Sequence, residues 1–295
     1  MTDAKNWKLG LSSCSTRRVD EDTFAAYAAA GIEILEVSLP PERYADTDWT
    51  AVRALSERYG VTVRSFHLPY SPFERNNIAS PDEDLRRSTV ALHRQLLRAA
   101  ATVGATVAVI HPSGEPNEPG ERPRLMEAAR RSLAELAPAA EALGISLAVE
   151  DLPRTGLGRD SAEILDLLRA DDRLRVCFDT NHLLGGERPE DFARAVGSRI
   201  VTVHVSDYDF RNERHWLPGE GKNDWPAIVS ALEAADYAGP LLYEVPFAAP
   251  DTIRRPRPLT PADIVRNRAA LAEKRVPPPF GVPDEAVCLR RAWTG

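Results

Sequence analysis

Cysteine is scarce in this chain of 295 residues, and its scarcity excludes two kinds of structure. The three cysteines, Cys14, Cys177 and Cys288, lie far apart in the sequence, and no CxxC pair occurs. A disulfide framework and a thiolate zinc site both need grouped cysteines, so neither is indicated. The sequence also has no run of about 18 apolar residues, which is the length that a membrane-spanning helix needs.

The start of the chain, MTDAKNWKLG, has no apolar stretch of the kind found in signal peptides. We therefore expect a soluble protein in a reducing, cytoplasmic setting, with no attachment to a membrane.

A surplus of positive charge is also absent. Lys and Arg together number 37 against 44 Asp and Glu, which gives a formal net charge of −7. Nucleic-acid binders normally neutralise phosphates with a basic face, so nucleic acid is not an expected partner. The count covers the whole chain, however, and leaves a local basic groove open. Hydrophobic residues make up 43% of the chain, enough for a large core, which excludes a disordered protein.

Short β-rich runs alternate with longer helical patterns along the chain, in which apolar residues recur at helical spacing. The predicted strands are Lys8–Ser13, Glu33–Ser38, Thr62–His67, Thr106–His111, Ser146–Glu150, Arg175–Asp179, Ile200–His204 and Pro240–Glu244. The predicted helices include Phe24–Ala30, Leu85–Val103, Arg124–Leu143, Ser161–Leu168 and Trp225–Ala235. Such alternation predicts parallel strands closed into a single-domain (β/α)8 TIM barrel. The alternative is a doubly wound open sheet, but no GxGxxG motif follows the first strand.

The segment after Pro250 is rich in Pro and Arg. We therefore divide the chain into a barrel over residues 1–250 and a C-terminal helical extension over residues 251–295. The extension is expected to hold one helix near Pro261–Lys274, followed by a Pro-rich tail from Pro277. It would pack on the barrel or against a partner subunit, which leaves a homo-oligomer open.

Side chains that can bind a metal stand at the ends of the predicted strands. They are His67, His111, Glu150, Asp179, His204 and Glu244. Of the six histidines, only His93 lies inside a helical pattern. In a TIM barrel these strand ends meet on the face that carries function. Carboxylates buried there need a cation or hydrogen-bond donors. Three carboxylates with one imidazole would favour one divalent ion, Mn²⁺, Co²⁺ or Mg²⁺, with Zn²⁺ also accommodated.

The order of these residues resembles the xylose isomerase-like barrel superfamily. That superfamily includes sugar phosphate isomerases and epimerases, ketose 3-epimerases, inosose dehydratases and apurinic endonucleases of the endonuclease-four type. The likeness extends over about residues 8–246. Its most specific stretch is HVSDYDFRNERHWLPGEGKNDW, residues 204–225, together with the Glu that ends the fifth strand, the DTNH of the sixth and the YEVP of the eighth.

The resemblance implies roles for particular residues. The metal ligands would be Glu150, Asp179, His204 and Glu244. The substrate-binding residues would be His67, His111, His182, Arg214, His215 and Trp216, and whether Arg214 or His215 contacts substrate oxygens is left open. Trp216 would stack on a sugar face, with ordinary packing under a loop as the alternative. No organic cofactor is implied, and Glu36, which ends the second strand, is not included in the predicted site.

These residues lead to a mechanistic hypothesis. The reaction would be proton transfer next to a carbonyl of a sugar, sugar phosphate or inositol-derived substrate, through an enediolate stabilised by the metal. Glu150 and Glu244 would form the acid–base pair, one removing a proton and the other returning it. The hypothesis covers an epimerase, an isomerase or a dehydratase. The alternative for both glutamates is a ligand role without proton transfer.

Two other functions stay open. One is a metal-dependent phosphodiesterase that resembles the apurinic endonucleases, whose zinc-ligand pattern this sequence matches at most positions. It departs from that pattern at Glu213-Arg214-His215, where the nucleases carry Asp-x-His, and its acidic balance also counts against a nuclease. The other is a non-catalytic sugar-binding barrel, because a fold by itself does not prove an activity.

Overall fold

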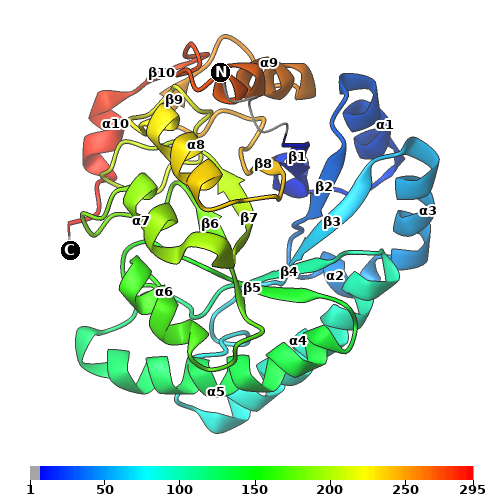
Figure 1. Ribbon diagram of the computed structural model, residues 1–295, viewed down its shortest axis with the longest axis vertical. Coiled ribbons are helices and arrows are strands. Elements are labelled where there is room, and N and C mark those ends of the chain that lie inside the picture. The colour runs from blue at the N-terminus through cyan, green and yellow to red at the C-terminus, as the bar shows by residue number, and fades with distance from the viewer. Residues whose placement is uncertain (1–6, 295) are drawn as a thin grey trace.

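The computed structural model describes residues 7–294, so the predicted domain ends at residues 1 and 295 lie outside the described part of the chain. Within that part, eight parallel strands follow one another around a closed barrel (Figure 1). They are β1 (Leu9–Ser12), β2 (Ile34–Val37), β3 (Thr62–His67), β4 (Val107–Ile110), β5 (Ser146–Glu150), β6 (Arg175–Asp179), β7 (Ile200–Val205) and β8 (Leu241–Tyr243). The predicted (β/α)8 TIM barrel is confirmed, and each strand boundary lies within one residue of its prediction.

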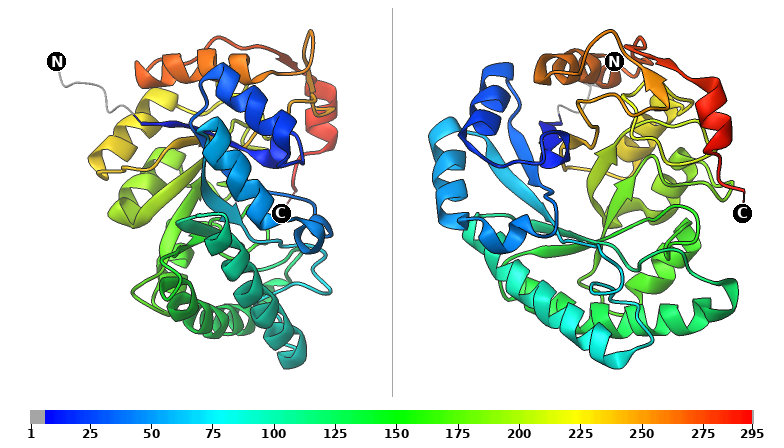
Figure 2. Two further views of the ribbon diagram at one scale, coloured as in Figure 1. Left: turned by 90° about the vertical axis from the view of Figure 1, so that its right-hand side faces the viewer. Right: turned by 180° about the vertical axis from the view of Figure 1, so that it is seen from behind.

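Helices surround the barrel on the outside (Figures 1 and 2). They are α1 (Glu21–Ala30), α2 (Arg43–Asp46), α3 (Trp49–Tyr59), α4 (Glu83–Thr102), α5 (Arg122–Glu141), α6 (Ser161–Leu168), α7 (Pro189–Val196), α8 (Trp225–Ala234), α9 (Pro261–Ala272) and α10 (Glu285–Arg290). Short 3₁₀ helices occur at η1 (Ser13–Ser15), η2 (Pro119–Glu121) and η3 (Gly197–Arg199). No helix within residues 7–294 is long and apolar enough to cross a lipid bilayer.

Aspartate side chains start many of these helices. The carboxylate of Asp82 accepts backbone hydrogen bonds from Asp84 and Leu85 at the start of α4, and Asp224 accepts one from Ala227 at the start of α8. Asp20, Asp48, Asp160 and Asp284 cap α1, α3, α6 and α10 in the same way. Such caps satisfy N–H groups that the first helical turn leaves free, and each typically contributes about 1 kcal/mol.

Apolar residues fill the space between the strands and the helices, and a smaller set fills the barrel itself. The interior cluster contains Val107, Val109, Ala148 and Cys177, all buried. Cys177 borders the polar groups described below, because its Sγ lies within 4.8 Å of ligand atoms of Glu150 and His204. All three cysteines are free thiols, with no disulfide between them. Cys177 and Cys288 are buried and Cys14 is half-buried.

The segment beyond residue 250 packs on the barrel. Helix α9 contacts both α1 and α8 and so takes the place of the eighth barrel helix, as Figure 2 shows for the orange helix beside blue α1. The rest of the tail pairs β9 (Ile253–Arg254) with β10 (Val282–Pro283) in an antiparallel ladder. Its α10 packs against the long connection between β7 and α8, where Trp216, Ile253 and Cys288 form a small apolar cluster.

Asp207 organises this long connection between β7 and α8. One carboxylate oxygen accepts hydrogen bonds from the backbone N–H groups of Tyr208 and Asn223. The other accepts from the Gly219 backbone at 2.8 Å and from the Trp225 indole at 3.0 Å. The backbone of Asp207 also exchanges two hydrogen bonds with that of Trp216. A single buried carboxylate therefore fixes the path of the segment that carries part of the site.

Replacing Asp207 with Ala is expected to destabilise the protein by about 3 kcal/mol or more, because several buried donors lose their acceptor at once. The matched control is Asp224→Ala, which removes one exposed helix cap in the same region and is expected to cost about 1 kcal/mol. Urea unfolding of both variants checks the difference. Equal losses in the two variants would contradict this role for Asp207.

Candidate functional site

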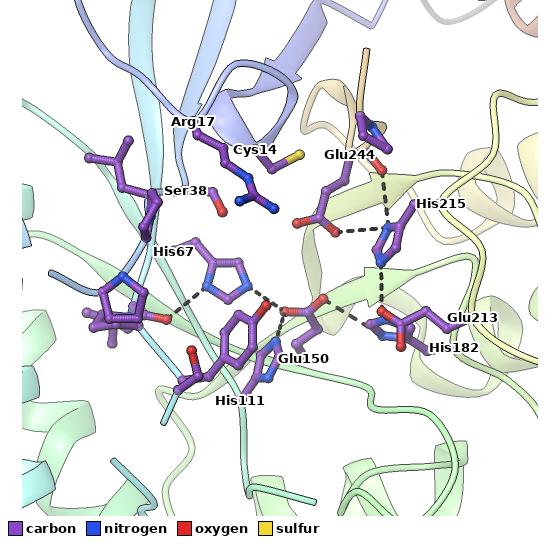
Figure 3. A pocket seen from close by; sticks show the side chains of 18 of the residues that line it. Cys14, Arg17, Ser38, His67, His111, Glu150, His182, Glu213, His215 and Glu244 are labelled. Carbon is purple, nitrogen blue, oxygen red and sulfur yellow. Dashed lines mark hydrogen bonds and ion pairs between the residues drawn. The ribbon is translucent and has the colours of Figure 1, made fainter. Parts of the chain in front are cut away.

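Most of the polar side chains that the sequence places at the strand ends line one cavity of about 460 Å³, while the fully buried Asp179 and His204 lie beneath it against Glu150 and Glu244 (Figure 3). His67, Glu150, Asp179 and His204 belong to strands β3, β5, β6 and β7, while His111 and Glu244 directly follow β4 and β8. The loops after β6 and β7 add the side chains of His182, Glu213 and His215 to the cavity. The sequence-based prediction of a polar site at this end of the barrel therefore corresponds to a real recess in the structure.

Four of these residues form a compact group that we call the four-residue group: Glu150, Asp179, His204 and Glu244. Their ligand atoms all lie within 4.8 Å of one another. The Nδ1 atom of His204 lies 2.9 Å from Oε1 of Glu150, 3.3 Å from Oε2 of Glu244 and 3.9 Å from Oδ2 of Asp179.

The four-residue group fits a divalent cation. Oδ2 of Asp179 is buried and has no hydrogen-bond partner within the described residues, which is costly for a carboxylate oxygen unless a cation binds it. Three carboxylates and one imidazole are also the hard, oxygen-rich donor set that Mn²⁺, Mg²⁺ and Co²⁺ prefer.

Glu36 at the end of β2 supports this group from behind. It is fully buried, and its carboxylate lies 3.1 Å from Nε2 of His204. Ser65 donates a hydrogen bond to Oε2 of Glu36 at 2.7 Å, and Nε2 of His204 lies 3.2 Å from the same oxygen. A His204 that donates its Nε2–H to Glu36 leaves the lone pair on Nδ1 for a metal, an arrangement common around metal-bound histidines.

Sequence reasoning did not include Glu36 in the site. The sequence shows only that Glu36, a charged residue, ends a buried strand. In the structure Glu36 lies next to Ser65 on the neighbouring strand β3. Its partner His204 lies far away in the sequence, and only closure of the barrel brings the two together.

A second group lies on one side of the four-residue group. Nε2 of His67 lies 3.1 Å from Oε2 of Glu150, and Nε2 of His111 lies 3.2 Å from the same oxygen. The two carboxylate oxygens of Glu150 therefore point to different partners, since its Oε1 faces His204. The ring of Tyr70 stacks on that of His111 with centroids 4.1 Å apart and forms part of the cavity wall.

A third group, made of His182, Glu213 and His215, lies on the opposite side. Oε1 of Glu213 is 2.7 Å from Nε2 of His215 and 3.6 Å from Nε2 of His182. Nδ1 of His182 bonds to the Asp151 carbonyl oxygen at 2.7 Å, which turns its Nε2 toward Asp179. The loop residue Glu213 completes a set of ligand-competent atoms within 4.8 Å of one another.

Two of the predicted substrate-binding residues have their side chains engaged elsewhere. The guanidinium of Arg214 is buried, pairs with Asp209 at 2.9 Å and donates to the Cys288 carbonyl oxygen. The indole of Trp216 is buried against Ile253 and Cys288 and donates a hydrogen bond to Thr252. Between the two neighbours Arg214 and His215, it is the imidazole of His215 that faces the other site residues (Figure 3).

The charges of the site compensate one another. Burial alone would raise the pKa of Glu150, but the imidazoles of His204 and His111 more than offset it and hold that pKa well below its ordinary value. Burial by itself would lower the pKa of a histidine. The hydrogen bond to Glu150 nevertheless raises the pKa of His67 to about 9, and the hydrogen bond to Glu213 raises the pKa of His215 to about 9. Burial raises the pKa of Asp179 to about 6. In the metal-free protein, protons on imidazoles thus supply the positive charge that the carboxylates require.

The family described as xylose isomerase-like TIM barrel matches residues 24–267. The chain belongs to this family.

Relatives of this xylose isomerase-like barrel include proteins named for two different activities. A probable endonuclease 4 of Symbiobacterium thermophilum is 30% identical over 217 residues, 66% of this chain and 75% of that protein. A D-psicose 3-epimerase of Ruminiclostridium cellulolyticum is 26% identical over 239 residues, 75% of each chain. Among solved structures, a D-tagatose 3-epimerase-like protein superimposes with a TM-score of 0.76 at 22% identity, covering 90% of this chain and 96% of the other. That last likeness shows the fold.

Replacing Glu36 with Gln is expected to weaken metal binding ten- to a hundredfold, because His204 loses the charged partner that orients its ring. The matched control is Glu33→Gln, which changes an exposed glutamate near the start of β2 and should leave the affinity unchanged. Calorimetric titration of chelator-treated protein with Mn²⁺ gives the dissociation constants. Equal affinities for wild type and Glu36→Gln would contradict this role for Glu36.

The stability of the metal-free protein is expected to fall as the pH rises from about 6.5 to above 9. His67 and His215 have raised pKa values in the folded state, so their contribution is complete below the ordinary histidine pKa of 6.5 and is lost as the pH passes 9. The expected loss is on the order of 3 kcal/mol for each of the two histidines. Urea unfolding of chelator-treated protein at pH 6.5 and 9.5 measures it. A stability that rises over this interval would contradict the described charge balance.

Proposed function

We propose that this protein is a divalent-metal-dependent sugar or polyol epimerase or isomerase that transfers a proton next to a carbonyl group through an enediolate. The observation that carries the proposal is the pair Glu150 and Glu244. Each contributes one oxygen to the four-residue group, Oε1 of Glu150 and Oε2 of Glu244, and both face the same cavity (Figure 3). Two carboxylates that share a site in this way can divide the removal and the return of a proton between them.

The second carboxylate oxygen of each glutamate, Oε2 of Glu150 and Oε1 of Glu244, is not the one that faces His204. Oε1 of Glu244 accepts no hydrogen bond within residues 7–294, and this side chain is partly open to the cavity. Oε2 of Glu150 lies between the imidazoles of His67 and His111, and His67 is held in place by the bond from its other ring nitrogen to the Leu68 carbonyl oxygen. The lowered pKa of Glu150, held down against burial by His204 and His111, keeps this carboxylate ionised.

The ion belongs in the four-residue group, where Glu150, Asp179, His204 and Glu244 would hold it. When bound, it supplies Lewis-acid stabilisation of negative charge that develops on substrate oxygens. Glu36 keeps His204 oriented, and Asp151 keeps His182 turned toward Asp179 through its carbonyl oxygen.

The cavity suits a small molecule. Its volume of about 460 Å³ falls in the range of small-ligand sites. Apolar walls come from Leu39, Pro40, Pro41 and Tyr70, and polar groups cluster at the bottom around Glu150. This division matches a sugar, whose hydroxyl groups need polar partners while its carbon skeleton packs against apolar side chains. The relative named D-psicose 3-epimerase supports the same substrate class.

The variants Glu150→Gln and Glu244→Gln are expected to lower turnover at least about a thousandfold, because an amide cannot exchange the proton. A screen of ketoses and inososes in D₂O, read by NMR as deuterium entering a substrate carbon, measures the reaction. Each variant is compared at equal metal content, so that loss of the ion is not mistaken for loss of the base. Glu33→Gln is the matched control, since this exposed glutamate lies outside the cavity lining, and it should keep the wild-type turnover. Full exchange by a metal-loaded Glu150→Gln or Glu244→Gln variant would contradict the assignment.

A second candidate function is a metal-dependent phosphodiesterase. The observation that favours it is the presence of the two flanking groups, since His67 and His111 with Glu150, and His182 and His215 with Glu213, each offer three ligand atoms close together. The relative named probable endonuclease 4 points the same way. Incubation of the pure protein with an abasic-site duplex decides between the two. The epimerase proposal expects no cleavage, whereas strand cleavage that is lost in Glu213→Gln would favour the phosphodiesterase.

A further inference from the structure

Arg17, at the end of the turn after β1, directs its guanidinium into the cavity (Figure 3). It enters from the side of β1, beside Ser38 and Cys14, and faces the space bounded by His67 and Glu244. Within residues 7–294, no hydrogen bond or ion pair engages this guanidinium. The neighbouring Arg18, by contrast, pairs with Asp20 at 2.9 Å and is not part of the cavity lining. The donors of Arg17 are therefore available to a ligand.

The backbone around Arg17 is built to hold it in place. Its φ of 57° lies in the left-handed region, which is uncommon for residues other than glycine and often marks functional positions. The hydroxyl of Ser13 bonds to both the carbonyl oxygen and the N–H of Ser38, at 2.9 and 2.8 Å. Ser15 donates to the Val245 carbonyl oxygen at 2.8 Å. These bonds tie the turn to the strand ends on either side, β2 and β8.

We propose that Arg17 binds an anionic group of the substrate, so that the substrate is a sugar phosphate or a sugar acid. A guanidinium presents parallel N–H donors that match two oxygens of a phosphate or a carboxylate. The hydroxyl of Ser38 lies on the same side of the cavity and offers a further donor (Figure 3). The inference rests on the proposed function for the sugar part of the substrate.

Three ketose probes that differ at one carbon test the inference: D-fructose, D-fructose 6-phosphate and D-fructuronate. Calorimetric binding to the metal-loaded protein gives a dissociation constant for each. Wild type is expected to bind at least one of the two anionic probes tenfold or more tighter than D-fructose. Preference for the phosphate or for the carboxylate identifies which anion the site accepts.

The variant Arg17→Gln is expected to bring the three dissociation constants within about twofold of one another, with the affinity for D-fructose and the metal content unchanged. Arg18→Gln, the matched control, should keep the wild-type preference. Equal binding of all three probes by wild type, no binding of either anionic probe, or a preference that survives in Arg17→Gln would overturn the inference. So would Arg17-dependent binding of an abasic duplex without binding of either anionic ketose.

Binding and turnover separate this inference from the proposed function. An Arg17-dependent preference without deuterium exchange into any ketose would support the anion site while the epimerase proposal fails. Exchange into D-fructose, with no preference for an anionic probe, would support the epimerase and refute the anion site.

Discussion

The structure depends on one electrostatic constraint, the burial of several carboxylates at one end of the barrel. Glu36, Glu150 and Asp179 are almost fully buried, and burial of ionised carboxylates is costly unless positive charge or hydrogen-bond donors accompany them. His204 stands at the centre of this arrangement, because its two ring nitrogens face Glu36 on one side and the four-residue group on the other. In the metal-free protein, protonated imidazoles offset the negative charge of these carboxylates. A bound divalent cation would supply the positive charge in their place.

The surrounding structure keeps these groups in position. The carboxyl ends of eight short strands bring the side chains together, and the buried carboxylate of Asp207 fixes the connection that carries Glu213 and His215. The C-terminal segment then packs over the outside of that connection through α10 and the cluster around Trp216. Residues remote from the chemistry thus explain why the loop after β7 has one defined path.

Much of the fold was readable from the sequence because strand and helix periodicities alternate without interruption. The strand ends at His67, Glu150 and Asp179 coincide with their predictions, since each polar residue stands where an apolar run stops. Side-chain direction was not readable in the same way. Arg214 and His215 are adjacent in the sequence, yet Arg214 forms a buried ion pair with Asp209 while His215 faces the cavity. The two side chains take different directions because of the conformation of the folded loop.

Two contributors to the site escaped sequence reasoning for related reasons. Glu36 acts through His204, a contact across the barrel that no local pattern reveals. Arg17 lies in a turn with a left-handed backbone, and nothing in its sequence neighbourhood distinguishes it from Arg18, which pairs with Asp20 outside the cavity lining. Sequence patterns indicate which residue types reach a barrel end, and three-dimensional packing decides which of them face the ligand.

The most direct test of this account is the metal content of protein purified without chelators, counted per chain by elemental mass spectrometry. We expect close to one divalent ion per chain in wild type, and close to none in an Asp179→Asn variant that remains folded. A wild-type protein without any bound ion would contradict the four-residue metal group. Two or three zinc ions per chain would contradict the single-ion site and would assign the flanking histidines to metal binding as well.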